Sequence, residues 1–144
     1  MIRPRPSHVI RNLRRGRAQR LLSGATAAAA LPLGAEIYVN HYAGSFGNKL
    51  MWTPVVLSPA LAAAGVAGVA SERAARTWLP ALSALYMLNG AAGVYLHLRG
   101  IARKPGGLRE ASYNLVMGPP LLAPGSLSMV GAIGLVAATM RRER

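Results

Sequence analysis

Two histidines carry the chemistry that this sequence supports best. His41 ends the first long apolar segment of the chain, and His97 ends the third. Consecutive membrane-crossing segments alternate in direction, so the ends of the first and third segments lie at the same membrane face. Two imidazoles at one face provide the axial ligands of a b-type haem. The pair therefore raises one alternative for the function of the chain, a haem b or quinone-binding electron-transfer membrane subunit.

Two arginines follow the second histidine and suit an acidic ligand. Arg99 and Arg103 lie just after His97, and guanidinium groups bind carboxylates through paired hydrogen bonds. We expect them to contact haem propionates or another anionic ligand. The competing interpretation is that His41 and His97 only make hydrogen bonds to lipid, backbone or a neighbouring subunit, in which case no cofactor is expected.

Glu36 is the one acidic residue inside an apolar segment. An ionisable group within a membrane span is costly, so we expect a buried carboxylate paired with Lys49 or Arg99. One alternative places Glu36 near the headgroups in an ordinary ion pair. Another makes the chain a small transporter or channel with Glu36 in its path.

The rest of the polar inventory excludes most catalysis. The chain has no cysteine and no aspartate, and its four acidic residues are all glutamates. Disulfides, thiolate metal sites, aspartyl dyads and Ser-His-Asp triads are therefore excluded. We predict no catalytic residue and no metal site, so the chain is expected not to be an enzyme but at most a subunit of an oxidoreductase complex.

The elements that position these residues are apolar helices. Of 144 residues, 52% are hydrophobic, yet the net charge is +13 because the basic residues cluster between long uncharged runs. A bilayer core about 30 Å thick needs roughly 20 apolar residues per helix. The sequence predicts an all-α membrane bundle with four transmembrane helices over residues 21–39, 50–70, 77–98 and 115–140, between basic tails at 1–20 and 141–144. The prolines of the last segment leave open a re-entrant alternative to a full span.

The distribution of basic residues sets the expected topology. Most of the 17 lysines and arginines lie in the N-terminal tail, in the loop after the second segment and at the C-terminus. The positive-inside rule then places both termini in the cytoplasm of a multi-pass bacterial inner-membrane protein. Basic residues that flank apolar runs do not form a nucleic-acid footprint, so no nucleic-acid partner is expected.

Two further features predict contacts with partners. The third segment carries Asn89, Gly90 and Gly93 at helical spacing, a pattern of close helix packing. The outer loop 99–109 is basic, with Arg99, Arg103, Lys104 and Arg109. We expect a non-catalytic accessory or anchoring subunit of a larger membrane complex, such as an electron-transport complex. Its expected partners are other membrane subunits, lipids and an acidic periplasmic or redox protein.

Three sequence blocks carry a resemblance. Residues 41–48 (HYAGSFGN), 97–107 (HLRGIARKPGG) and 113–124 (YNLVMGPPLLAP) are similar to blocks in a group of small uncharacterised bacterial four-helix integral membrane proteins. The resemblance covers most of the chain after Glu36. It implies the membrane fold and one shared outer surface, and it implies no activity, cofactor or catalytic residue.

Overall fold

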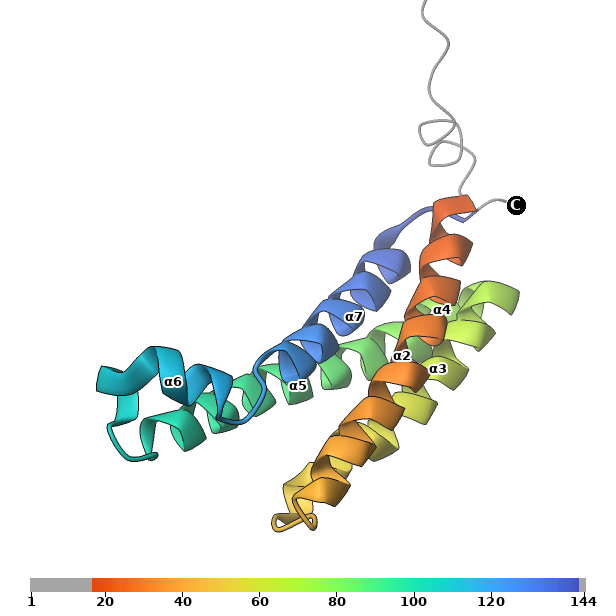
Figure 1. Ribbon diagram of the computed structural model, residues 1–144. Helices are drawn as coiled ribbons and strands as arrows, with labels where there is room; N and C mark the ends of the chain where they lie inside the picture. Colours follow the sequence, from red (N-terminus) through yellow and green to blue (C-terminus); the bar gives the residue numbers. More distant parts are fainter. Residues whose placement is uncertain (1–16, 143–144) are drawn as a thin grey trace, which may run out of the picture.

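The computed structural model describes residues 17–142, and every regular element in that range is helical (Figure 1). The four long helices are α2 (Arg17–Ala43), α3 (Trp52–Ala70), α5 (Trp78–Ala102) and α7 (Leu122–Thr139). The short elements are η1 (Lys49–Met51), α4 (Glu72–Arg76), η2 (Gly107–Glu110) and α6 (Ala111–Val116). Most of the predicted N-terminal tail, residues 1–16, and the last two residues of the C-terminal tail lie outside the described range.

Within residues 17–142, four helical stretches are long and apolar enough to cross a membrane. They cover Arg17–Ala43, Lys49–Ala70, Glu72–Ala102 and Leu122–Thr139. Large apolar side chains such as Leu21, Val66 and Leu88 are exposed on their outer faces, where a lipid environment would cover them. The chain therefore has the all-α composition of a multi-pass membrane protein.

The long helices form two pairs. α2 packs along α3, and α5 packs along α7. Figure 1 shows the pairs meeting where α2 begins and α7 ends, which we call the terminal end, and diverging toward the opposite, open end. The core between the pairs contains buried side chains from all four long helices, including Ala30, Leu61, Leu79, Tyr86 and Leu127.

The fourth predicted span begins later than expected. Instead of one helix over 115–140, the chain forms α6, leaves the helical conformation at 117–121 and begins α7 at Leu122. Pro119 and Pro120 lack the N–H that a continuous helix needs, so the break falls there. Pro124 lies in the first turn of α7, where a backbone N–H has no acceptor within the helix, so its absence costs little. The predicted N-terminal boundary of this span is therefore wrong.

The small-residue line on α5 packs inside the chain. A Cβ on Gly90 would lie 2.5 Å from Ser128 Oγ, and a Cβ on Gly93 would lie 2.8 Å from Pro124 Cβ, both on α7. Asn89 Nδ2 donates a hydrogen bond of 2.6 Å to Thr53 Oγ1 of α3. Within the chain, glycine lets α5 approach α7, and Asn89 ties it to α3, so the close helix packing indicated by this spacing occurs between helices of one chain. Contact of these residues with another subunit stays a prediction.

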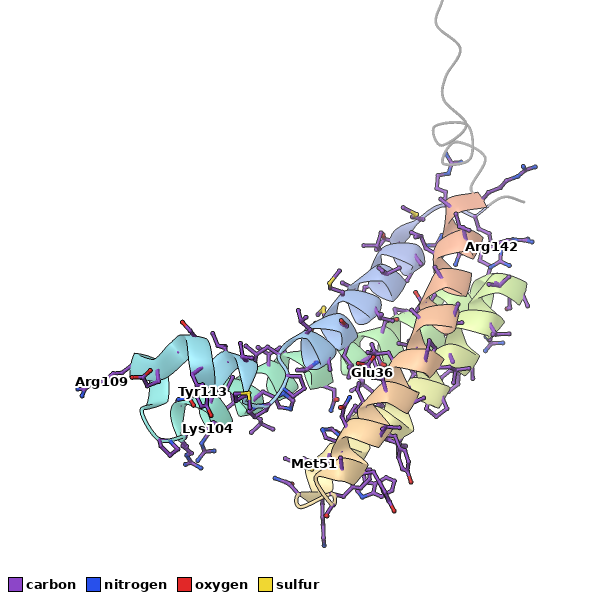
Figure 2. All side chains as sticks on the ribbon, in the orientation of Figure 1. Glu36, Met51, Lys104, Arg109, Tyr113 and Arg142 are labelled. Atoms are coloured by element: carbon purple, nitrogen blue, oxygen red, sulfur yellow. The ribbon has the colours of Figure 1, made fainter. Side chains whose placement is uncertain are left out.

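Arg142 connects three parts of the chain at the terminal end through hydrogen bonds. Its guanidinium group donates to Gly68 O at 2.7 Å, to Val69 O at 2.6 Å and to Gln19 Oε1 at 3.1 Å. It thus joins the chain beyond α7 to the last turn of α3 and the first turn of α2. Part of the predicted C-terminal tail is therefore held against the bundle (Figure 2).

Arg76 makes a second connection at the same end. Its Nη1 donates to Ala138 O at 2.7 Å, which links α4 to the last turns of α7. Lysine and arginine near a helix C-terminus satisfy carbonyls that have no partner within the helix. Together, Arg76 and Arg142 form what we call the terminal clamp.

Candidate functional site

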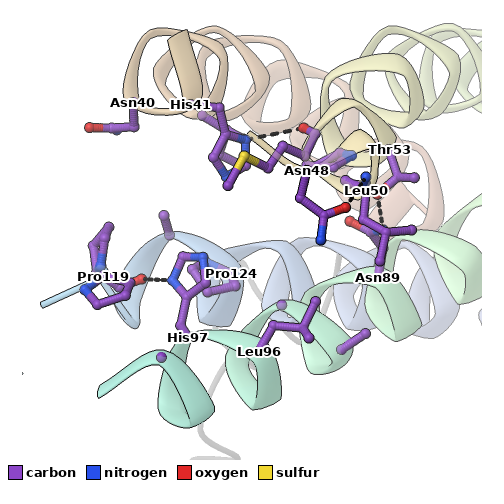
Figure 3. Close-up of a pocket in the computed structure, with 18 of the residues that line it drawn as sticks. Asn40, His41, Asn48, Leu50, Thr53, Asn89, Leu96, His97, Pro119 and Pro124 are labelled. Carbon is purple, nitrogen blue, oxygen red and sulfur yellow. Dashed lines mark hydrogen bonds between the residues drawn. The ribbon is translucent and has the colours of Figure 1, made fainter. Parts of the chain in front are cut away.

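A pocket of about 620 Å³ lies between the two helix pairs at the open end (Figure 3). It falls in the size range of cofactor sites, roughly 300–1,000 Å³. All four residues predicted to bind a cofactor line it: His41, His97, Arg99 and Arg103. The structure thus brings these residues together from two helices that are far apart in sequence.

His41 forms part of the α2 wall of the pocket. It lies in the last turn of α2, and its Nδ1 is 3.1 Å from Met51 O at the end of η1. The Phe46 ring packs edge-on against the imidazole at a centroid distance of 6.0 Å. A carbonyl oxygen only accepts hydrogen bonds, so Nδ1 carries the proton and Nε2 carries the lone pair of the neutral ring.

His97 forms part of the α5 wall and is held in the same way. Its Nδ1 donates to Pro120 O at 2.6 Å. Pro120 O is free for this bond because Pro124, four residues later, has no backbone N–H to donate to it. In the neutral ring, Nε2 again carries the lone pair. Both imidazoles therefore have the same tautomer, imposed by backbone carbonyls (Figure 3).

The two arginines lie at the exposed side of the pocket. Arg99 and Arg103 are exposed, are four residues apart and project from the same face at the end of α5. The other cations of the predicted loop do not line the pocket: Lys104 Nζ donates to Met117 O at 2.7 Å, and Arg109 lies exposed on η2. The basic loop 99–109 is therefore divided between a pocket wall and an outer surface.

Polar contacts between α3 and α5 close the inner side of the pocket. The bond between Asn89 and Thr53 joins the two helices there, and both residues line the pocket. Deeper in the bundle, Ser58 Oγ and Tyr86 OH are 2.9 Å apart, and both residues are buried. The roles of Thr53 and Ser58 were missed in the sequence, where single hydroxyl residues in apolar helices give little indication of their partners.

Glu36 is not a buried residue in the single chain. Its neighbours Gly34 and Ile37 face the core, and Glu36 is turned about 100° from Ile37, so it is exposed. Within residues 17–142 it forms no salt bridge with Lys49 or Arg99, and it does not line the pocket. The expectation of a buried, paired carboxylate is therefore wrong at the level of this chain.

Among the residues that line the pocket, two are histidines and none is a carboxylate or a thiol. Among residues 17–142, no three His, Cys, Asp or Glu side chains come together as a metal site.

The chain was compared with known proteins. No family model matches it, and comparison with curated proteins and with solved structures finds no match. The resemblance to small bacterial membrane proteins therefore rests on the three sequence blocks alone.

Proposed function

We propose that this chain is an anchoring subunit of a bacterial membrane electron-transport complex and that its pocket binds a b-type haem between His41 and His97. The observation that carries the proposal is the shared state of the two histidines. Each donates its Nδ1–H to a backbone carbonyl, which leaves both Nε2 lone pairs for a ligand in one pocket. A bound haem would supply one-electron redox chemistry, and the chain itself would perform no catalysis.

The surroundings of the histidines support a haem. A histidine that binds a metal almost always donates its other ring N–H to a carbonyl, carboxylate or water, which fixes the orientation of the ring. Met51 O and Pro120 O take this role. Apolar side chains line the space between the walls, including Ile37, Leu96 and Leu127. The two arginines beside the pocket carry the charge opposite to that of haem propionates, and a guanidinium group can donate two hydrogen bonds to one carboxylate.

The tautomer of the histidines suits their Nε2 atoms to a metal and leaves donation to a quinone to other residues of the pocket, such as Arg99 and Arg103. The carbonyl oxygens of a quinone accept hydrogen bonds, so the protein must supply donors. The Nδ1–H groups of His41 and His97 are already committed to Met51 O and Pro120 O. The neutral rings then offer lone pairs at Nε2, which bind a metal ion but do not donate to a quinone.

Visible spectroscopy tests the proposal. The full chain is purified from membranes in mild detergent, as isolated and after incubation with haem, and compared with His41→Ala, His97→Ala and the double variant. We expect a six-coordinate low-spin spectrum for the parent, loss of the low-spin form in each single variant and loss of stoichiometric binding in the double variant. His8→Ala, in the N-terminal tail, is the matched control and should behave like the parent. A chain that binds no haem, or a Soret band that survives in the double variant, would refute the proposal.

Partner contacts form the second part of the proposal. Exposed apolar faces of the long helices, with side chains such as Val56, Leu85 and Met129, would pack against other membrane subunits. Native purification followed by mass spectrometry should recover a stoichiometric membrane partner. A monodisperse chain with no partner in mild detergent would contradict this part and leave the haem proposal standing.

A further inference from the structure

Residues 103–117 form an arm that projects beyond the helix pairs. The arm follows α5, contains η2 and α6, and returns toward α7 through residues 118–121. Figure 2 shows Lys104, Arg109 and Tyr113 gathered on the arm, far from Arg142 at the terminal end. The pocket does not require most of this segment, because Arg103 is its one residue that lines the pocket.

The arm has a defined internal structure. Asn114, which is only 2% exposed, donates from Nδ2 to Pro105 O at 3.0 Å and to Gly107 O at 2.8 Å. The turn between them needs glycine, because Gly106 and Gly107 have φ values of 77° and 50°. Lys104 Nζ donates to Met117 O, which links the start of the arm to its end. These bonds fix which side chains the arm presents outward.

The outward side chains are apolar and basic. Tyr113, Val116 and Met117 are 64%, 81% and 60% exposed, and their i, i+3, i+4 spacing places them on one face of the helical turn. Arg109 is exposed beside them, and the arm contains three basic residues against the single acid Glu110. An apolar face bordered by cations is the pattern of a segment that lies in a membrane interface, and tyrosine favours the headgroup level.

The lengths of the adjoining helices place the arm at that level. α5 has 25 residues and α7 has 18, so they measure about 37 Å and about 27 Å at 1.5 Å per residue. A bilayer core is about 30 Å thick. The last turns of α5 therefore reach the headgroup region, and the arm returns the chain from there to the start of α7.

We propose that the arm is an interfacial anchor, with Tyr113, Val116 and Met117 inserted among the upper acyl chains of the leaflet at the open end and Arg109 bound to anionic lipid phosphates. The anchor does not depend on haem binding. It gives part of the basic loop a lipid partner in place of the acidic protein expected from the sequence.

The absence of cysteine in the chain allows a direct depth measurement. Single variants Val116→Cys and Arg109→Cys carry a nitroxide spin label in the full-length protein, reconstituted into phosphatidylcholine vesicles with or without phosphatidylglycerol. Val66→Cys, on the exposed face of α3, is the reference for acyl chains. Ser71→Cys, exposed in the connection between α3 and α4, is the reference for water. Accessibility to oxygen and to a water-soluble nickel chelate gives the depth of each label.

The anchor predicts a distinct result at each position. The label at position 116 should be protected from nickel and accessible to oxygen, as at position 66, and the label at position 109 should have intermediate values. In the background of Val116→Cys, Arg109→Glu should make the label at position 116 shallower in vesicles with phosphatidylglycerol. A label at 116 that is as accessible to nickel as at 71, or that becomes protected only when a partner protein is added, would overturn the proposal. Equal depth in both lipid mixtures would overturn its ionic part.

Discussion

Replacement of Arg142 by alanine should markedly destabilise the bundle. The guanidinium group makes two short hydrogen bonds, to Gly68 O and Val69 O, and a longer one to Gln19 Oε1. A hydrogen bond from a charged donor contributes about 1.5–3 kcal/mol. Because the site is only partly buried, water replaces part of this interaction in the variant. Three such bonds would sum to about 4.5–9 kcal/mol, and replacement by water reduces the expected fall in the free energy of unfolding to about 2–4 kcal/mol.

The neighbouring arginine gives a matched control. Arg141→Ala removes the same charge from an exposed position and should change stability by less than about 0.5 kcal/mol. Arg142→Lys keeps the charge but loses the planar fork that reaches three acceptors, so it should recover only part of the loss. Equilibrium unfolding in mixed micelles, followed by far-UV circular dichroism, measures all three variants. If Arg142→Ala and Arg141→Ala have equal stability, the role assigned to the clamp is wrong.

Two other substitutions probe the pocket and the layer beneath it. Pro124→Ala keeps the Cβ that packs on α5 but adds a backbone N–H in position to compete for Pro120 O. Nitrogen-15 NMR should then show His97 losing its pure Nδ1–H tautomer, and an unchanged spectrum would contradict the role given to the proline. Tyr86→Phe removes the hydrogen bond to Ser58, which keeps its own bond to Pro54 O. In the same unfolding assay we expect the free energy of unfolding to fall by about 1 kcal/mol. A fall of about 3 kcal/mol or more would contradict the role of a single hydrogen bond.

The sequence predicted the pocket residues better than the boundaries of the last helix. The alternation of spans placed His41 and His97 at one end, and the structure has them on opposite walls of one pocket. The start of α7 was missed because hydropathy continues through the residues before Leu122, while the prolines stop the hydrogen-bond ladder. The free carbonyl of Pro120 could have been found from the proline four residues later.

Other errors came from helices without a clear apolar stripe. In α2 small residues occur on every face, so hydropathy does not indicate which way the side chain of Glu36 points, and the carboxylate is exposed. The spacing of Asn89, Gly90 and Gly93 correctly indicated close helix packing. It could not indicate whether the partner helix belonged to the same chain, which depends on the tertiary arrangement.

The helix pairs diverge from the terminal clamp toward the open end. A small rotation of a long helix near the clamp therefore produces a larger displacement of its far end. α2 has 27 residues and is therefore about 40 Å long. A rotation of roughly 5° about its first turn moves its far end by about 3.5 Å, from the same rise per residue. Packing at the other end of the molecule therefore acts on the gap between the two imidazoles together with the Asn89–Thr53 bond beside the pocket. Thermodynamic linkage requires any such coupling to act in both directions: a ligand that favoured a closer approach of the pocket walls would stabilise the clamp by the same free energy by which the clamp strengthened binding of that ligand.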